Sequence, residues 1–346
     1  MPDLNWDKYL ADFTNQAKDA QMTDWGIERS IAYAHRLYSQ DLPIIYSPKH
    51  LSSLLGYDLE YLLGVSNAPQ VFYRSFSIPK RTKGKRRISE PLPGLKDIQY
   101  WLANNFFSCF PVSKYAKAYL KKSSIKANAR FHRRQPCVMR LDIKNFFPSI
   151  NTNKIFRQLL AHGYTTSVSM LIAKLCTLYN ELPQGAPTSP VLSNLLMYKA
   201  DNRLGAFAQY NGYRYTRYAD DLFFSGRINI GNVVQFTKNV LMYEGFNLNE
   251  EKTRVYRKGQ QQRVTGIVVN EKLQATRKYR RQLRQDIHYI ERNGLMGHML
   301  KKNITQNNYP EHLAGKAHFI LQINPNDKDA KHALKVLEPI LKRTTG

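Results

Sequence analysis

Two adjacent aspartates, Asp220 and Asp221, lie between two short segments that have the composition of β-strands. Aromatic, basic and β-branched residues alternate over residues 213–217, and an apolar run over residues 222–224 follows the pair. This pattern predicts a β-hairpin with both carboxylates at its turn. Aspartate is common in solvated turns, but two adjacent negative charges are better explained by a divalent cation that neutralises them.

A third aspartate, Asp142, ends another strand-like segment, which covers residues 138–143. Two segments with helical periodicity separate it from the Asp220–Asp221 pair. If the two strands are neighbours in one sheet, the three carboxylates converge on one point. Such a site would hold two Mg²⁺ ions, which clamp the attacking and leaving oxygens of a phosphoryl transfer.

The charge balance indicates a polyanionic partner. The 346 residues include 52 Lys and Arg against 26 Asp and Glu, a formal net charge of +26. Nucleic acid is the usual partner of so basic a chain, and a membrane surface is the alternative. No apolar run is long enough to span a bilayer, and the first residues do not resemble a signal peptide. Because the three cysteines are widely spaced, we expect neither disulfides nor zinc, and a cytoplasmic location.

Periodicity and composition divide the chain into three ranges. Residues 1–70 have helical periodicity and no chemistry of their own, so we interpret them as a helical N-terminal extension packed on the core. Residues 71–270 alternate strands and helices in an order typical of an α+β domain with an antiparallel sheet. Residues 271–346 are helical and basic, which favours a grip on a nucleic-acid duplex over a merely solvated surface.

Two further segments have features of a nucleotide site. A strand over residues 72–78, a basic turn and a second strand predict a hairpin whose tip carries Lys85 and Arg86. Such a tip can neutralise a triphosphate, or it can contact a nucleic-acid backbone more generally. Downstream, Gln184 and Gly185 lie in a proline-rich loop, where the glycine permits close approach of the backbone to a ligand.

Three motifs in this order resemble those of reverse transcriptases. Leu-Asp-Ile-Lys-Asn-Phe-Phe-Pro-Ser at 141–149 and Tyr-Ala-Asp-Asp at 218–221 are similar to the two catalytic motifs of that family. Leu-Pro-Gln-Gly-Ala-Pro-Thr-Ser-Pro at 182–190 is similar to its nucleotide-binding loop. The resemblance spans roughly residues 72–270 and implies a right-hand polymerase fold with fingers, palm and thumb.

Two more strings resemble the signatures of retron reverse transcriptases. Asn128, Ala129 and His132 match an Asn-Ala-x-x-His signature, and Val264, Thr265 and Gly266 match a Val-Thr-Gly signature. The resemblance implies that both strings bind RNA. It also implies copying of part of a structured noncoding RNA into multicopy single-stranded DNA (msDNA), started from a guanosine 2′-hydroxyl. Retrons act in antiphage defence, so the expected partners are that RNA, the msDNA, an RNA–DNA hybrid and an effector or toxin protein.

The family assigns roles to the candidate residues. Asp142, Asp220 and Asp221 would hold two Mg²⁺ ions, and deoxynucleoside triphosphates (dNTPs) would be the substrates. Phe147 resembles the bulky residue that rejects a ribose 2′-hydroxyl, although core packing and the adjacent Phe146 leave that choice open. Lys252 resembles a lysine near the pyrophosphate and could equally contact a nucleic-acid backbone.

Three alternatives stay open. The first is another bacterial reverse transcriptase class, of the mobile-intron or abortive-infection type, against which the two retron signatures argue. The second is an RNA-binding scaffold that restrains a toxin, against which the intact aspartates argue. The third is an RNA-dependent RNA polymerase, which Phe147 disfavours.

Overall fold

The computed structural model describes residues 5–79 and 84–344. The chain folds into two compact units, each assembled from several segments. The first unit comprises the described residues of Met1–Tyr119, Ile143–Leu204 and Phe236–Leu248. The second unit comprises the described residues of Leu120–Asp142, Gly205–Gln235 and Asn249–Gly346. Within the described residues, no helix is both long enough and apolar enough to cross a bilayer.

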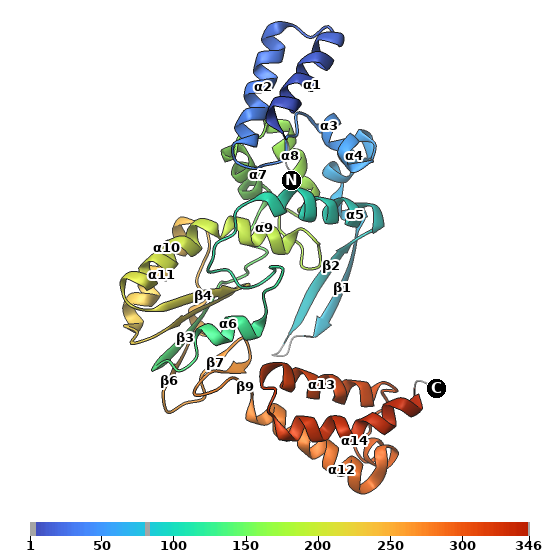
Figure 1. Cartoon of the computed structure of the whole chain (residues 1–346), viewed down its shortest axis with the longest axis vertical. Helices are drawn as coiled ribbons and strands as arrows, with labels where there is room; N and C mark the ends of the chain where they lie inside the picture. Colours follow the sequence, from blue (N-terminus) through green and yellow to red (C-terminus); the bar gives the residue numbers. More distant parts are fainter. Residues whose placement is uncertain (1–4, 80–83, 345–346) are drawn as a thin grey trace. The chain divides into compact units, whose positions relative to one another are not determined.

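The first unit is mainly helical (Figure 1). Local sequence explains its helix ends: Ser47 caps α3 by accepting a hydrogen bond from the His50 amide, Pro48 takes the first helical position, and Gly56 ends the helix at φ 70°. The helical character predicted for the N-terminal range is confirmed. The helices of the first unit are α1 (Trp6–Asp19), α2 (Asp24–Tyr38), α3 (Pro48–Leu55), α4 (Leu59–Asn67), η1 (Pro69–Phe72), α5 (Pro93–Trp101), η2 (Leu102–Phe106), η3 (Phe107–Cys109), α7 (Thr152–Ala161), α8 (Thr166–Leu175) and α9 (Ser189–Leu196).

A two-stranded hairpin lies in the same unit. β1 (Tyr73–Pro79) and β2 (Lys85–Pro91) pair antiparallel, with Tyr73 opposite Pro91 and Pro79 opposite Lys85. The hairpin predicted from the sequence is therefore confirmed, while the basic residues 80–83 of its tip lie outside the described residues. Two further helices are α10 (Tyr198–Tyr210) and α11 (Ile230–Tyr243).

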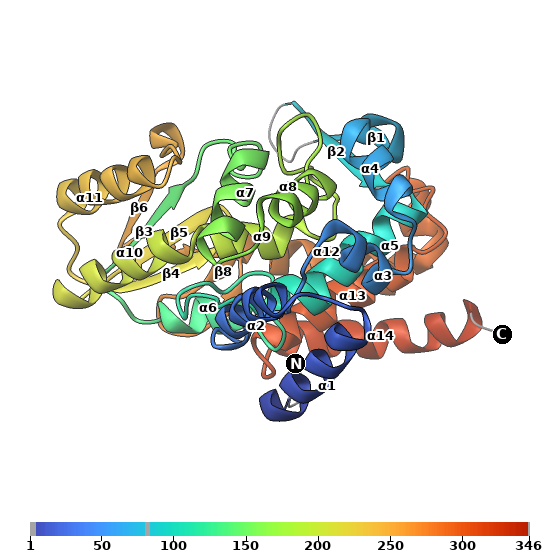
Figure 2. The same cartoon turned by 90° about the horizontal axis from the view of Figure 1, so that it is seen from above.

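The second unit contains a four-stranded antiparallel sheet with strand order β4-β5-β3-β6, visible in Figure 2. The central strand β3 (Cys137–Asp142) pairs with β5 (Asp221–Ser225) on one side and β6 (Arg254–Arg257) on the other, and β4 (Arg214–Tyr218) completes the hairpin with β5. Val138, Met139 and Leu141 of β3 are buried, as the apolar strand pattern requires. The strands that carry the three aspartates are neighbours, as predicted.

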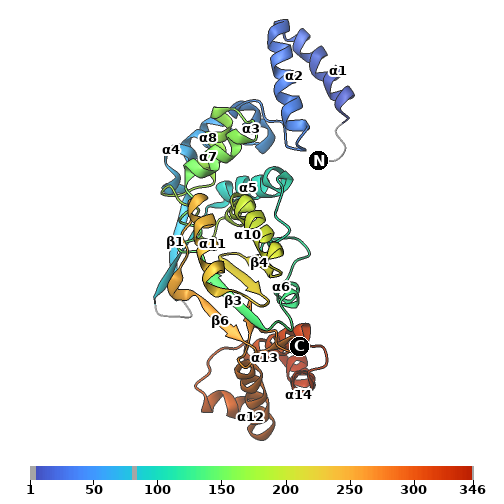
Figure 3. The same cartoon turned by 90° about the vertical axis from the view of Figure 1, so that its left-hand side faces the viewer.

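A smaller sheet, two short helices and three longer helices complete the described part of the second unit. The sheet contains β7 (Arg263–Val264), β8 (Ile267–Val268) and β9 (Gln274–Ala275), and the short helices are α6 (Ile125–Phe131) and η4 (Glu250–Lys252). Figure 3 shows α12 (Arg277–Lys301), α13 (Tyr309–Ile323) and α14 (Lys328–Thr344) stacked on one another. Leu283, Ile287 and Ile290 of α12 are buried in the core that these helices share with the small sheet.

Candidate active site

The antiparallel register of the sheet brings the three aspartates together. Asp142 is the last residue of β3 and lies opposite Asp221, the first residue of β5. Asp220 occupies the turn between β4 and β5, where Tyr218 pairs with Asp221 and only two residues connect the strands. Ala219 is the other turn residue and has φ 57°, a left-handed conformation that costs an alanine about 1 kcal/mol. The fold thus holds a strained turn where the carboxylates meet.

Burial shapes the charges of these carboxylates. Burial raises the pKa of Asp221 to about 6, with Asp220 and Asp142 acting in the same direction and Arg140 acting against it. Burial, followed by the charge of Asp142, also raises the pKa of Asp220 above its ordinary value. Asp142 itself is only 2% exposed. Three carboxylates in one partly buried site favour the binding of a positively charged group or ion.

Two basic side chains already supply part of that charge. The Lys252 ammonium, on η4 beside β6, lies 3.0 Å from Oδ1 and 3.2 Å from Oδ2 of Asp142. The Arg140 guanidinium donates from Nε to Oδ1 of Asp221 at 2.8 Å, and its Nη2 lies 2.8 Å from the same oxygen. Lys252 was expected near the site. Arg140 was missed, although it lies two residues before Asp142 and side chains alternate between the faces of a strand.

The donor set fits a hard divalent cation. Carboxylate oxygens are the ligands that Mg²⁺ prefers, and it commonly takes only a few from the protein while water and substrate phosphates supply the rest. Among residues 5–79 and 84–344, no three His, Cys, Asp or Glu side chains are already arranged around one point as metal ligands. Instead, Lys252 and Arg140 pair with oxygens of Asp142 and Asp221. A cation and its substrate would have to compete with these two bases.

The nucleotide-loop residues lie in the first unit and pack on the hairpin. The backbone oxygen of Gln184 accepts a hydrogen bond from the Ser89 amide of β2 at 2.8 Å. Gly185 has φ 125°, and a Cβ added there would lie 2.9 Å from the Ser89 carbonyl oxygen. Only glycine fits this position without a backbone shift. The loop and the hairpin therefore form one local structure.

The described basic residues of the hairpin divide by their contacts. The Arg87 guanidinium lies over the ring of Tyr179, 5.3 Å from its centroid. Lys85 and Arg86 are exposed, and neither side chain makes a hydrogen bond or ion pair with another described residue. Strand alternation directs Arg86 away from the side that Arg87 uses. Lys85 and Arg86 are thus available to an anionic ligand.

The two phenylalanines of the first catalytic motif differ in burial. Phe146 is 6% exposed and lies between the rings of Phe147 and Phe246, with centroid distances of 5.6 and 5.9 Å. Phe147 is only half-buried, and its other aromatic neighbour is Tyr119, at 6.3 Å. Phe146 is therefore a core residue, whereas Phe147 keeps surface that a ligand can touch.

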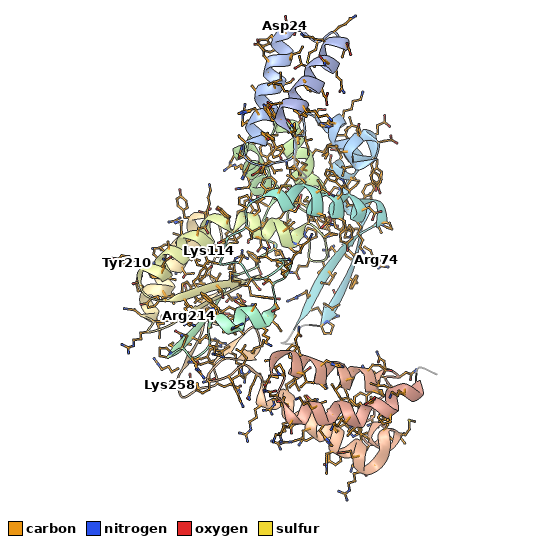
Figure 4. The ribbon with its side chains drawn as sticks, in the orientation of Figure 1. Asp24, Arg74, Lys114, Tyr210, Arg214 and Lys258 are labelled. Carbon is orange, nitrogen blue, oxygen red and sulfur yellow. The ribbon has the colours of Figure 1, made fainter. Side chains whose placement is uncertain are left out.

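The Asn-Ala-x-x-His signature lies in and just after α6 and binds β4 and β5. The His132 ring is 0% exposed, with Nδ1 2.7 Å from the Ser225 hydroxyl and Nε2 2.7 Å from the Thr216 hydroxyl. The Thr216 hydroxyl in turn donates to Oδ1 of Asn128 at 2.6 Å. Burial lowers the pKa of His132 to about 3, so the ring is neutral at pH 7. Arg214 of β4, labelled in Figure 4, adds a hydrogen bond to the Phe131 carbonyl at 2.7 Å.

The Val-Thr-Gly signature forms the turn between β7 and β8. Thr265 and Gly266 both have positive φ, 47° and 82°, as a two-residue hairpin of type I′ requires. The Thr265 hydroxyl donates to the Ile125 carbonyl at the start of α6, at 3.2 Å. Both signatures therefore meet on α6.

Burial corrects the expectation that these signature residues bind RNA directly. Asn128, Ala129, His132 and Val264 are all 0% exposed and present no surface to a nucleic acid. Thr265 is half-buried, and only Gly266 is exposed. The sequence alone could not show this, because the burial depends on β4, β5 and α6 packing together from distant segments. The signatures brace the hairpin that carries Asp220 and Asp221.

Comparisons with known proteins agree with this geometry. The family model described as "Reverse transcriptase (RNA-dependent DNA polymerase)" matches residues 78–270. The chain is 38% identical over 236 residues to the "Retron Mx65 reverse transcriptase" of Myxococcus xanthus, covering 62% of this chain and 55% of that protein. It is 38% identical over 228 residues to the "Retron Mx162 reverse transcriptase" of the same organism, covering 57% and 47%.

A shorter relative is covered more fully. The chain is 33% identical over 261 residues to the "Retron Ec86 reverse transcriptase" of Escherichia coli, covering 74% of this chain and 81% of that protein. The chain thus spans about half the length of the two Myxococcus relatives. The family match, together with the antiparallel sheet and the helical parts on both sides of it in sequence, confirms the predicted α+β right-hand polymerase fold.

Proposed function

Because the chain belongs to the reverse transcriptase family, as a member of the retron type, we propose that it is an RNA-directed DNA polymerase with a two-metal active site. The observation that supports this most strongly is the register that sets Asp142 opposite Asp221, with Asp220 in the adjoining turn. Carboxylates on neighbouring strand ends are suited to hold the two metal ions of a nucleotidyl transfer.

Asp142, Asp220 and Asp221 would hold two Mg²⁺ ions, which supply charge neutralisation at the attacking hydroxyl and at the leaving pyrophosphate. Two basic side chains of the protein, Arg140 and Lys252, would contribute further positive charge to the site. Arg140 orients Asp221 and opposes the rise of its pKa, which keeps that carboxylate ionised near neutral pH. Lys252 brings a mobile positive charge to the same place, suited to a phosphate oxygen of the incoming nucleotide or its pyrophosphate.

The dNTP would be bound by residues of the first unit. The exposed side chains of Lys85 and Arg86 suit the triphosphate, because guanidinium and ammonium groups bind phosphate oxygens strongly. Gln184 and Gly185 would offer backbone and amide groups to the nucleotide from the loop that packs on β2. Phe147, half-buried beside Phe146, would exclude a ribose 2′-hydroxyl by its volume.

The template we propose is a structured noncoding RNA, part of which is copied into msDNA from a guanosine 2′-hydroxyl. Support comes from the retron names of the relatives and from the two retron signatures on α6. The net charge of +26 suits both the RNA and the RNA–DNA hybrid. An antiphage role with an effector or toxin partner follows from the same resemblance.

The experiment is DNA synthesis by the purified full chain on an RNA template with a DNA primer, four dNTPs and Mg²⁺. We expect extension that requires the RNA template and stops when the metal is chelated. Equal extension with ribonucleotides would indicate an RNA polymerase instead. RNA binding without any extension across templates and metals would favour the scaffold that restrains a toxin.

A further inference from the structure

The second unit contains a basic cavity of about 510 Å³ apart from the aspartates. It lies at the start of α12, where that helix faces the small sheet. Four arginines, one carboxylate and two glutamines define its chemistry, and the charged residues among them are Arg277, Arg280, Arg281, Arg284 and Asp329.

The four arginines share one side of α12. Their spacing of three, four and seven residues from the first places them on one helical face. Like charges at this spacing destabilise an isolated helix by a few tenths of a kcal/mol per pair, roughly 0.2–0.5. The cavity also lies at the N-terminal end of α12, which is helical from Arg277 to a kink at Gly294, and the helix dipole adds positive potential there. Within the described residues, acidic partners offset only part of this concentration of charge.

Two of the four arginines are fixed by aspartates at the start of α14 and just before it. Nε of Arg280 lies 2.7 Å from Oδ2 of Asp327, which is 3% exposed, and the pair is a close ion pair that is not aligned as a hydrogen bond. Asp327 is itself held, because its Oδ1 accepts from the Ala330 amide at 3.1 Å. Asp329 lies 3.6 Å from Arg280 and 3.7 Å from Arg284. These ion pairs therefore fix the orientation of the Arg280 and Arg284 side chains in the wall of the cavity.

The other two arginines have no such partners. Arg277 and Arg281 are exposed, and neither side chain makes a hydrogen bond or ion pair with any residue in the described part of the chain. Their guanidinium groups have donors available beside a cavity in which Asp329 is the one acidic residue among the described residues that line it. Planar guanidinium groups bind phosphate oxygens in pairs and are the protein groups best suited to that ligand.

We propose that this cavity binds an internal phosphodiester of the RNA strand together with its ribose. The inference rests on the proposed function, which supplies the RNA. A single phosphate would leave most of a 510 Å³ cavity empty, whereas a nucleotide unit of the strand matches pockets of this size. The amides of Gln274 and Gln261 offer donors and acceptors for a 2′-hydroxyl. An anionic lipid surface would use the same charges but would gain nothing from a recess that also carries amide groups.

The test compares two double variants of the full chain that each remove two positive charges from α12. Arg277→Gln with Arg281→Gln empties the cavity of its unpartnered charges and breaks no ion pair of the described residues. Lys278→Gln with Arg292→Gln removes two exposed charges from the same helix outside the cavity. The probe is a fluorescent 40-nucleotide hairpin RNA without dNTPs, titrated at several salt concentrations, once with a 5′-hydroxyl and once with a 5′-phosphate.

We expect the cavity variant to bind both RNAs about tenfold more weakly. It should also lower the slope of log Kd against log salt by about one, because one phosphate of the RNA is no longer neutralised. The control should change binding less than about threefold. Equal weakening in the two double variants would overturn the proposal, as would weakening confined to the 5′-phosphorylated RNA. Weaker binding to vesicles containing phosphatidylserine, with RNA binding intact, would also overturn it.

Extension of a preformed RNA–DNA hybrid serves as the separate readout of the proposed function. At saturating hybrid both double variants should reach the maximal rate of the unaltered chain, because no altered residue belongs to the aspartate site. The weaker RNA binding of the cavity variant should appear only as a higher hybrid concentration at half-maximal rate. Absent extension by the unaltered chain would contradict the polymerase, while the RNA titration would still decide the cavity.

Discussion

The Lys252 ammonium lies 3.0 Å from Oδ1 of Asp142, so the most buried of the three acids is already paired with a base. The lysine side chain is 59% exposed and can leave, whereas the Asp142 side chain is 3% exposed and cannot. An ion pair this exposed on one side is worth at most about 1 kcal/mol. The Lys252–Asp142 ion pair can therefore compete with a cation for Asp142, and a bound cation can displace the lysine.

Lys252→Met should lower the Mg²⁺ concentration for half-maximal DNA synthesis by about three- to fivefold, because the competing ammonium is gone. The maximal rate should fall as well, because a positive charge near the leaving pyrophosphate is removed. Metal titration of the extension rate measures both. Lys258→Met, which alters an exposed lysine of the same unit (labelled in Figure 4), is the control. An unchanged metal requirement in the Lys252 variant would show that the ion pair plays no part in metal binding.

Phe147→Ala should allow ribonucleotides to compete with dNTPs, because removing the half-buried ring opens space for a 2′-hydroxyl. Phe146→Ala should instead lower stability by about 3–5 kcal/mol without relaxing the choice, since this ring is 6% exposed in the core. Incorporation of both nucleotide types at equal concentration, with thermal unfolding alongside, separates the two effects. Relaxed selection in the Phe146 variant alone would show that Phe146, and not Phe147, excludes the ribose 2′-hydroxyl.

Gly185→Ala should raise the KM for dNTPs by about tenfold, because a Cβ 2.9 Å from the Ser89 carbonyl oxygen forces the loop away from β2. The matched control is Gly212→Ala, where φ is 69° but nothing lies within 4 Å of the added Cβ. Both variants should lose about 1 kcal/mol of stability through backbone strain. An equal change of KM in both would attribute the effect to strain in general and not to the loop.

The chain should lose stability below about pH 6.5 because of His132. The pKa of the folded ring is lowered to about 3, so the unfolded chain binds a proton that the folded chain refuses. The free energy of unfolding should therefore fall by about 2 kcal/mol between pH 7 and pH 5, and continue to fall toward pH 3. Urea unfolding of the native chain and of His132→Asn measures this. The variant should be less stable at pH 7 and should lack this part of the pH dependence, and an identical slope in both would contradict the assignment.

Strong local patterns explain what was predictable. The composition around Asp142 and around Asp220–Asp221 indicated β-strands. If such strands are neighbours in one sheet, their three carboxylates lie close together, and this could be predicted from the sequence. The role of Arg140 could not, because it depends on Asp221 arriving on the adjacent strand. The same holds for the arginine cavity. Helical spacing groups its four arginines, but only the fold brings two aspartates to Arg280 and Arg284.

The bracing role of the signature residues was also beyond the sequence. The sequence does not distinguish an exposed histidine from a buried one. His132 becomes buried only when α6 packs on β4 and β5. Its two hydroxyl partners, Ser225 and Thr216, come from segments far along the chain. Tertiary contacts of this kind leave no local pattern.

The central claim is that Asp142, Asp220 and Asp221 carry out DNA synthesis while other surfaces bind the RNA. Asp220→Asn with Asp221→Asn tests it most directly, because asparagine keeps the volume and removes the charge. RNA-templated primer extension and RNA affinity should be measured side by side on the same preparation. We expect extension to fall on the order of 10³-fold or more, with the Kd for RNA changed less than about twofold. Undiminished extension by this double variant would contradict the account.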